Sequence, residues 1–121
     1  MDLTTDYLGL VLRNPLVASA SPLSHTLEGV RRLVDGGVGA VVLHSLFEEE
    51  IEHEAVRCAA LASAGADSFA ESLTYFPELP DTRAGHQHLS LLERARSTVD
   101  VPVIASVNGA TVGGWTGFAS R

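Results

Sequence analysis

Two apolar runs without polar alternation constrain the fold of this chain most strongly. They are GAVVL, residues 39–43, and VPVIASV, residues 101–107. A strand that is apolar at every position is buried on both faces, which is typical of a parallel sheet covered by helices. LVASA, residues 16–20, is a third candidate strand that ends in small residues. The three runs predict an α/β fold with parallel strands.

Helical patterns separate these candidate strands. The first lies between a candidate N-cap, Thr26, and a glycine pair at residues 36–37 that can end a helix. Its apolar residues recur at helical spacing and are Leu27, Val30, Leu33 and Val34. Residues 47–58 and 88–100 predict two further helices. The stretch 59–85 between them shows little periodicity and is expected to be a long loop.

Size and charge restrict the class of protein. The chain has 121 residues and a formal net charge of -7, and its positively charged residues are all arginines. We expect one domain, residues 1–121, with a single core. The acidic balance argues against nucleic acid as a partner, because binding to phosphates needs a basic surface. The sequence contains no long apolar run and no leader pattern, so no membrane association and a cytoplasmic location are expected.

Cysteine and histidine patterns give little support to a metal site. Cys58 is the only cysteine, which excludes an internal disulfide. It shares a predicted helix face with Phe47, Ile51 and Ala55, and we expect its side chain to be buried there. His86 and His88 have the spacing of a metal pair, but they are expected in a polar loop before a helix. Solvated histidines are the favoured interpretation there, and no metal is predicted.

The order of strands and helices fits the early part of a (β/α)8 TIM barrel. A complete barrel takes about 250 residues, and three strands cannot close one. We therefore expect the N-terminal part of such a barrel, an incomplete barrel of about three strands with helices. A small open sheet is the alternative.

Four segments in order resemble the N-terminal part of dihydroorotate dehydrogenase-like flavoproteins. They are YLGLVLRNPLVASASPLS, GGVGAVVLHSLFEEEI, DSFAESLTYFP and VPVIASVNGATVGGW. The resemblance covers nearly the whole chain. It implies an FMN-binding TIM barrel that oxidises dihydroorotate to orotate in pyrimidine biosynthesis, or a divergent relative with another small-molecule substrate. It also implies that the catalytic base lies outside this chain, so the chain alone is expected to be inactive.

The resemblance assigns cofactor-contacting residues after each strand. Ser19, Ala20 and Ser21 stand where small residues let the flavin ring approach the backbone. His44 and Ser45 follow the second strand. The family has a lysine and then a serine or threonine there, so the serine matches and the lysine does not. Imidazole is shorter than a lysine side chain and is less constantly charged, which favours a divergent substrate.

Two further positions complete the expected site. Asn108 follows the third strand, where its amide could reach flavin or substrate, although Asn-Gly is also a strong turn signal. Ser68 and Ser72 belong to the segment that resembles the family's substrate-covering loop, without its usual asparagine. A loop that packs on the barrel rim explains that segment equally well.

A second hypothesis belongs to a different class of function. The chain could be a non-catalytic truncated fragment, or a small α/β association module without flavin. A homo-oligomer is among the expected partners under either hypothesis. A reading frame that continues into a further strand and a loop bearing cysteine or serine would favour the enzyme.

Overall fold

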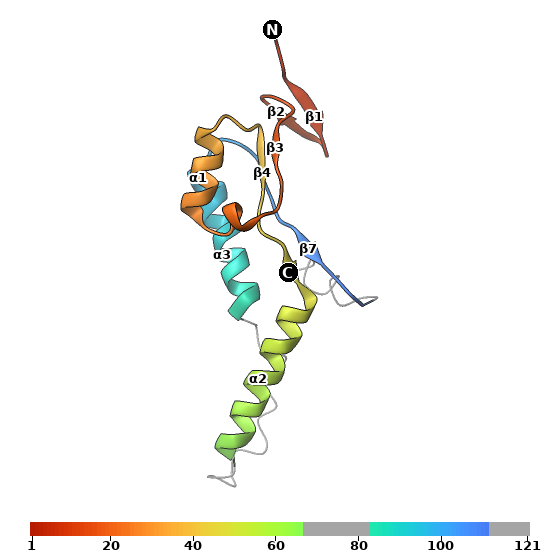
Figure 1. The fold of residues 1–121 in the computed structure, drawn as a ribbon, viewed down its shortest axis with the longest axis vertical. Helices are drawn as coiled ribbons and strands as arrows, with labels where there is room; N and C mark the ends of the chain where they lie inside the picture. The colour runs from red at the N-terminus through yellow and green to blue at the C-terminus, as the bar shows by residue number, and fades with distance from the viewer. Residues whose placement is uncertain (67–82, 112–121) are drawn as a thin grey trace.

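The computed structural model describes the backbone of residues 1–66 and 83–111, and the side chains of residues 1–61 and 83–111. These residues form an α/β fold around a parallel sheet (Figure 1). The sheet has the strand order β3-β4-β6, with β3 at Val17–Ala18, β4 at Ala40–Val42 and β6 at Val103–Ile104. Both pairings are parallel. Each apolar run of the sequence contains one of these strands, so the α/β prediction is confirmed.

An antiparallel hairpin precedes the sheet. It consists of β1, Thr5–Tyr7, and β2, Leu10–Leu12. Leu8 and Gly9 turn the chain with φ values of 51° and 76°. Leu12 is buried, whereas Leu8 is exposed. Paired left-handed residues match the twist of a two-residue hairpin.

The first helix forms where its capping residues predict it. α1 spans Leu27–Asp35, and the Gly29 amide donates to Thr26 Oγ1 at 3.1 Å. This bond satisfies one of the amides that a helix start leaves without a partner. Gly37 ends the segment at φ +96°, a conformation that suits glycine. A short 3-10 helix, η1 at Pro22–Ser24, leads into α1.

The core lies between the sheet and two helices. α1 and α3, Arg83–Thr98, lie on the same side of the sheet (Figure 1). The buried cluster comprises Val30, Val41, Leu43, Ala95 and Val101. Full burial of an aliphatic side chain of this size contributes roughly 1.5–3 kcal/mol. The core therefore fixes the distance between α3 and β4.

The second helix differs from its prediction in extent and burial. α2 spans Glu48–Ala66, so residues 59–66 of the expected loop are helical, and Phe47 belongs to β5, Leu46–Phe47. The expectation that Cys58 is buried is wrong, because its side chain is exposed. Val56, two positions before it, is 68% exposed. The outer half of α2 runs away from the sheet, where no described element covers it (Figure 1).

The third helix begins earlier than predicted. α3 starts at Arg83, which places His86 and His88 on a helix and corrects their assignment to a polar loop. The backbone amide of Ala84 donates to Glu54 Oε2 at 2.9 Å. A carboxylate that accepts from the first turn of a helix stabilises that turn. This contact from α2 explains why the helix extends beyond its apolar periodicity.

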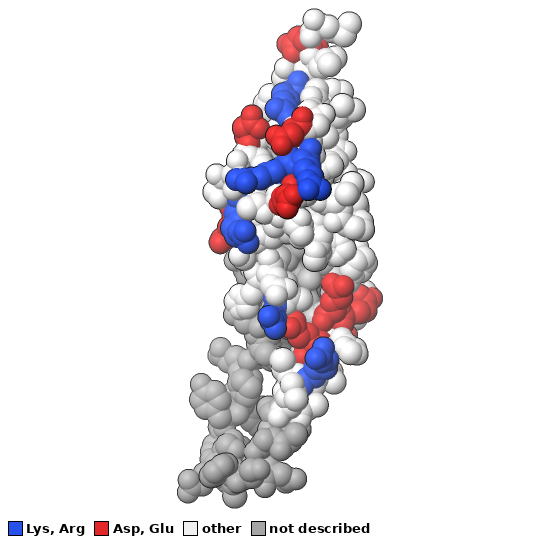
Figure 2. All heavy atoms as spheres, turned by 60° about the vertical axis from the view of Figure 1, so that its left-hand side comes forward, with Lys and Arg blue, Asp and Glu red and all other residues white. Residues whose placement is uncertain are grey.

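A second parallel pair continues the direction of the sheet. β5 pairs with β7, Val107–Asn108. The described residues do not close a barrel. In the described part of the chain, no helix has the length and apolar character needed to cross a bilayer. On the face in Figure 2, arginine side chains alternate with acidic ones, so that face has no extended basic surface.

Candidate functional site

The residues that follow β3, β4 and β6 meet at one edge of the sheet. Because the strands are parallel, their carboxyl ends share that edge. Beyond it, both β4 and β6 lose regular pairing before β5 and β7 resume it. Backbone bonds span the interruption, with Leu43 N to Ile104 O at 2.9 Å and Leu46 N to Ser106 O at 2.9 Å. The two chain segments thus stay side by side through a shared break.

A serine pair occupies this break. Ser45 Oγ and Ser106 Oγ lie 2.7 Å apart in a part-buried contact. Each of the two hydroxyl groups thus has a hydrogen-bond partner at the place where strand pairing is interrupted. It also sets the direction of the neighbouring His44 backbone.

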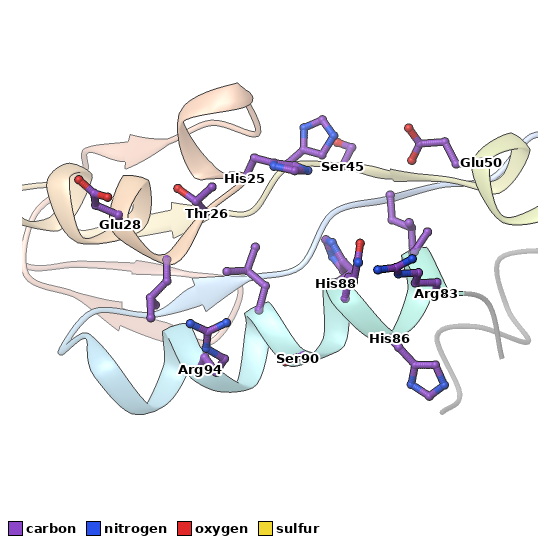
Figure 3. Close-up of a pocket in the computed structure, with 16 residues that line it drawn as sticks. His25, Thr26, Glu28, Ser45, Glu50, Arg83, His86, His88, Ser90 and Arg94 are labelled. Atoms are coloured by element: carbon purple, nitrogen blue, oxygen red, sulfur yellow. The ribbon is translucent and has the colours of Figure 1, made fainter. Parts of the chain in front are cut away.

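A pocket of about 970 Å³ lies next to the break (Figure 3). Its walls come from the start of α1, from the segment that leads from β4 into the first turn of α2, and from α3 between Arg83 and Arg94. The residues that carry its polar chemistry are His25, His44, Ser45, Arg83, His88 and Arg94. Several distant parts of the sequence therefore contribute to one concave surface.

Imidazole rings from separate elements gather in the pocket. His25 and His44 form an edge-to-face pair with ring centroids 4.9 Å apart and an interplanar angle of 80°. His88 is 8% exposed and projects from α3 toward the two segments that carry His25 and Ser45 (Figure 3). Its Nε2 atom is buried without a hydrogen-bond partner in the structure. A buried polar atom in that condition is uncommon in native proteins and indicates a missing partner.

Burial lowers the pKa of His88 below its ordinary value of 6.5. The charges of His44 and His25 lower this pKa further. Desolvation and like charge both disfavour the imidazolium form, so they act in the same direction. An anion beside His88 would have the opposite effect, because it would stabilise the imidazolium form.

Charged side chains of both signs line the pocket rim. Arg83 and Arg94 are exposed residues of α3, and neither forms an ion pair with a described carboxylate. Glu28, in contrast, pairs with Arg32 one turn along α1. Glu50 lies on the side of the pocket that carries Arg83 (Figure 3). The rim therefore offers guanidinium groups that are available to a ligand.

The structure divides the predicted site residues into two groups. His44 and Ser45 line the pocket, where His44 contacts His25. The other predicted cofactor residues, Ser19, Ala20, Ser21 and Asn108, are not part of its lining. Ser19 and Ala20 are exposed at the carboxyl end of β3, and Asn108 is exposed on β7. Ser68 and Ser72 lie outside the described residues.

Sequence reasoning missed His25, Ser106 and the burial of His88. His25 follows the first strand of the sheet and His44 follows the second. Because the carboxyl ends of parallel strands share one edge, the sequence could have predicted that the two residues lie close together. No sequence signal predicted that His88 lies in the pocket, because its position depends on α3 beginning at Arg83.

Glu48 holds the start of α2 to the segment after β7. It is 8% exposed, and its Oε2 accepts from the Ala110 amide at 2.6 Å and the Thr111 amide at 2.9 Å. The Thr111 hydroxyl donates to Oε1. The bond from the Thr111 side chain, followed by that from its amide, lowers the pKa of Glu48 below 4.5. The ionised carboxylate is the form that accepts all three bonds.

Metal-ligating side chains do not converge in the described part of the chain, where no group of three or more could hold an ion. Comparisons with protein-family models, with curated proteins and with solved structures found no match.

Proposed function

We propose that this chain is the N-terminal part of an FMN-dependent oxidoreductase of the dihydroorotate dehydrogenase type. The strand order supports this proposal, since β3, β4 and β6 are parallel neighbours in the order of the sequence. α1 and α3 both lie on one side of the sheet (Figure 1). A TIM barrel has this arrangement throughout, whereas a doubly wound sheet has it only within each of its two halves.

The observation that carries the proposal is the exposed, small-residue edge beyond β3. Ser19 and Ala20 are exposed and Ser21 is half-buried at the carboxyl end of a parallel strand. A flat ring can approach backbone atoms at this edge because no bulky side chain stands there. Barrel enzymes place their active sites at the same end of the strands. The small side chains of these residues therefore suit close approach of a flavin ring, and the exposed Asn108 carries an amide on β7, beyond the break that follows β6.

The role of His44 sets the choice of substrate. Its ring is held edge-on against His25, on the side of the pocket. A lysine at this place would supply a longer side chain and a permanent positive charge, which an imidazole does not supply. The proposed substrate class is therefore a small molecule that resembles dihydroorotate and is oxidised to a product with a carbon–carbon double bond. Dihydroorotate itself is the first substrate to test.

FMN, when bound, would supply the hydride acceptor for this reaction. The residues of this chain would position it: Ser19, Ala20 and Ser21 by close backbone approach, and Asn108 by its amide. Ser45 is held by Ser106 and fixes the backbone between these positions.

An anaerobic flavin titration tests the proposal. The protein from the complete reading frame is expected to bind FMN and to lose its absorbance near 450 nm, about the usual flavin maximum, when dihydroorotate is added. If the protein binds FMN but is not bleached, it is a flavoprotein and dihydroorotate is not its substrate. A protein that takes up no FMN would reject the proposal as a whole.

A matched pair of variants localises the flavin. Ala20→Phe places an aromatic side chain on the proposed approach surface, and Ala59→Phe places one on the exposed face of α2. We expect Ala20→Phe to weaken FMN binding at least tenfold and Ala59→Phe to leave it unchanged. Equal effects of the two substitutions on FMN binding would show that the flavin does not bind at the edge beyond β3.

A non-catalytic association module is the second candidate. Val56 and Leu61 are 68% and 71% exposed on α2, which gives this helix apolar side chains in solvent. Sedimentation equilibrium of the same protein separates the candidates. A colourless oligomer that dissociates on Val56→Asp substitution would favour association over flavin chemistry.

A further inference from the structure

We propose that the pocket between α3 and the segment His44–Ser45 binds a phosphate group through His25, His44, His88 and Arg83. The inference goes beyond the proposed function and does not depend on it, although the two share His44, to which the proposed function assigns the choice of substrate. The flavin ring is placed at the edge that carries Ser19 and Ala20, and these residues are not in the pocket lining.

The unpartnered nitrogen of His88 is the first argument. The side chain is more than nine-tenths buried, since its residue is 8% exposed, and its Nε2 has no hydrogen-bond partner. A buried polar group that is left unsatisfied destabilises the fold. A ligand oxygen in the pocket would satisfy this nitrogen and remove that destabilisation.

The arrangement of the other donors is the second argument. His25 comes from the turn before α1, His44 from the end of β4, and His88 and Arg83 from α3. A phosphate presents several oxygens in a tetrahedral array, so it can accept from donors on different sides. A carboxylate presents two oxygens in one plane, which suits a single guanidinium better. The distribution of donors around the pocket favours phosphate.

The charges around the pocket are the third argument. The titratable and charged side chains that line it are His25, Glu28, His44, Glu50, Arg83, His86, His88 and Arg94. Glu28 already pairs with Arg32. Arg94 is eleven positions from Arg83, about 16 Å along the helix axis at the usual rise. In Figure 3 Arg83 and His88 lie at the same end of the pocket, with Glu50 as the opposing charge, whereas Arg94 lies at the other end; the proposed phosphate therefore contacts Arg83 and not Arg94.

The size of the pocket indicates the class of ligand. Its volume of about 970 Å³ exceeds that of a phosphate ion, so the remainder of a phosphorylated small molecule has room beside it. Small-molecule sites in proteins typically span about 300–1,000 Å³. Leu27, Leu46 and Leu91 add apolar wall to this space. The geometry therefore fits a phosphate monoester with a compact organic part.

A histidine-resolved titration with inorganic phosphate tests the inference. We expect saturable shifts of the ring Cε1–Hε1 NMR signals of His25, His44 and His88, and no shift for His53, which lies outside this pocket on α2. Phosphate should also raise the pKa of His88, because the bound anion stabilises the imidazolium form. Uniform, non-saturating shifts of all histidines would reject the site.

Substitutions on α3 supply the matched control. Arg83→Gln removes the proposed guanidinium contact and should weaken phosphate binding about tenfold, the usual order for a charge-assisted hydrogen bond. Arg96→Gln removes the same charge from the same helix but outside the pocket lining, and binding should not change. His88→Gln should also weaken binding. Because Arg83 is exposed, its variant remains informative if His88→Gln does not fold.

Comparison ligands complete the test. Acetate at equal concentration should produce much weaker shifts than phosphate, and acetate binding of equal strength would overturn the phosphate assignment. The titration is run on protein free of FMN. Phosphate binding by a protein that takes up no flavin would support this inference while rejecting the proposed function. Flavin uptake without phosphate binding would support the proposed function and reject this inference.

Discussion

Ser45 and Ser106 hydrogen-bond across the break between the two parallel strand pairs, with their Oγ atoms 2.7 Å apart. The two residues are sixty-one positions apart in the sequence. Their bond lies where β4 and β6 lose regular pairing and before β5 and β7 resume it. It therefore joins the sheet to the start of α2 and supports the backbone of His44 at the pocket.

The serine pair should show energetic coupling. We expect Ser45→Ala and Ser106→Ala each to lower the free energy of unfolding by about 1 kcal/mol, because each leaves a part-buried hydroxyl without its partner. The double variant should lose less than the sum of the single losses. Urea unfolding measures all three. Strictly additive losses would show that the two hydroxyls do not interact in solution.

Glu48 should make stability depend on pH in the acid range. Its folded-state pKa lies below 4.5, so its contribution is complete above the unfolded value and is lost as the pH falls through the folded value. Glu48→Gln should lower the unfolding midpoint at neutral pH, since an amide accepts fewer of the three bonds. The adjacent, exposed Glu49 provides the control through Glu49→Gln. Equal pH profiles for the wild type and Glu48→Gln would contradict the assigned role.

His88 should add a second pH dependence closer to neutrality. Its folded pKa lies below the ordinary 6.5, so the unfolded chain binds more protons between the two values. Stability is then greatest above about pH 6.5 and falls as the pH decreases through the folded pKa. Urea unfolding at a series of pH values should show this slope in the wild type and a smaller one in His88→Gln. His53→Gln, at an exposed position, should retain the wild-type slope.

Gly29 should control the position of His25. A Cβ atom at Gly29 would overlap the Leu23 carbonyl oxygen, so the close approach of η1 to α1 requires glycine. We expect Gly29→Ala to destabilise the fold by about 1–3 kcal/mol, as overpacking does, and to disturb the His25 ring signal. Gly36→Ala is the control, because Gly36 is helical at φ -67°. An unchanged His25 signal in Gly29→Ala would show that the close approach of η1 to α1 does not control the position of His25.

Local sequence signals predicted much of the fold. The apolar runs predicted the β3, β4 and β6 strands, and Thr26 with the pair Gly36–Gly37 predicted both ends of α1. Caps and buried strands depend on residues close in sequence, so such signals are readable without the structure. The errors concerned α2 and α3. Their extents depend on contacts such as the one between Ala84 and Glu54, which no local pattern encodes.

By itself the sequence determined the alternation of strand and helix, the capping of α1 and the acidic start of α2. Only the tertiary structure decided that His25, His44 and His88 face one pocket and that Ser45 meets Ser106. The physical reason is the packing of α3 against the sheet through Ala95, together with the parallel register of β4 and β6. That packing and register fix distances between residues whose local sequences carry no information about one another.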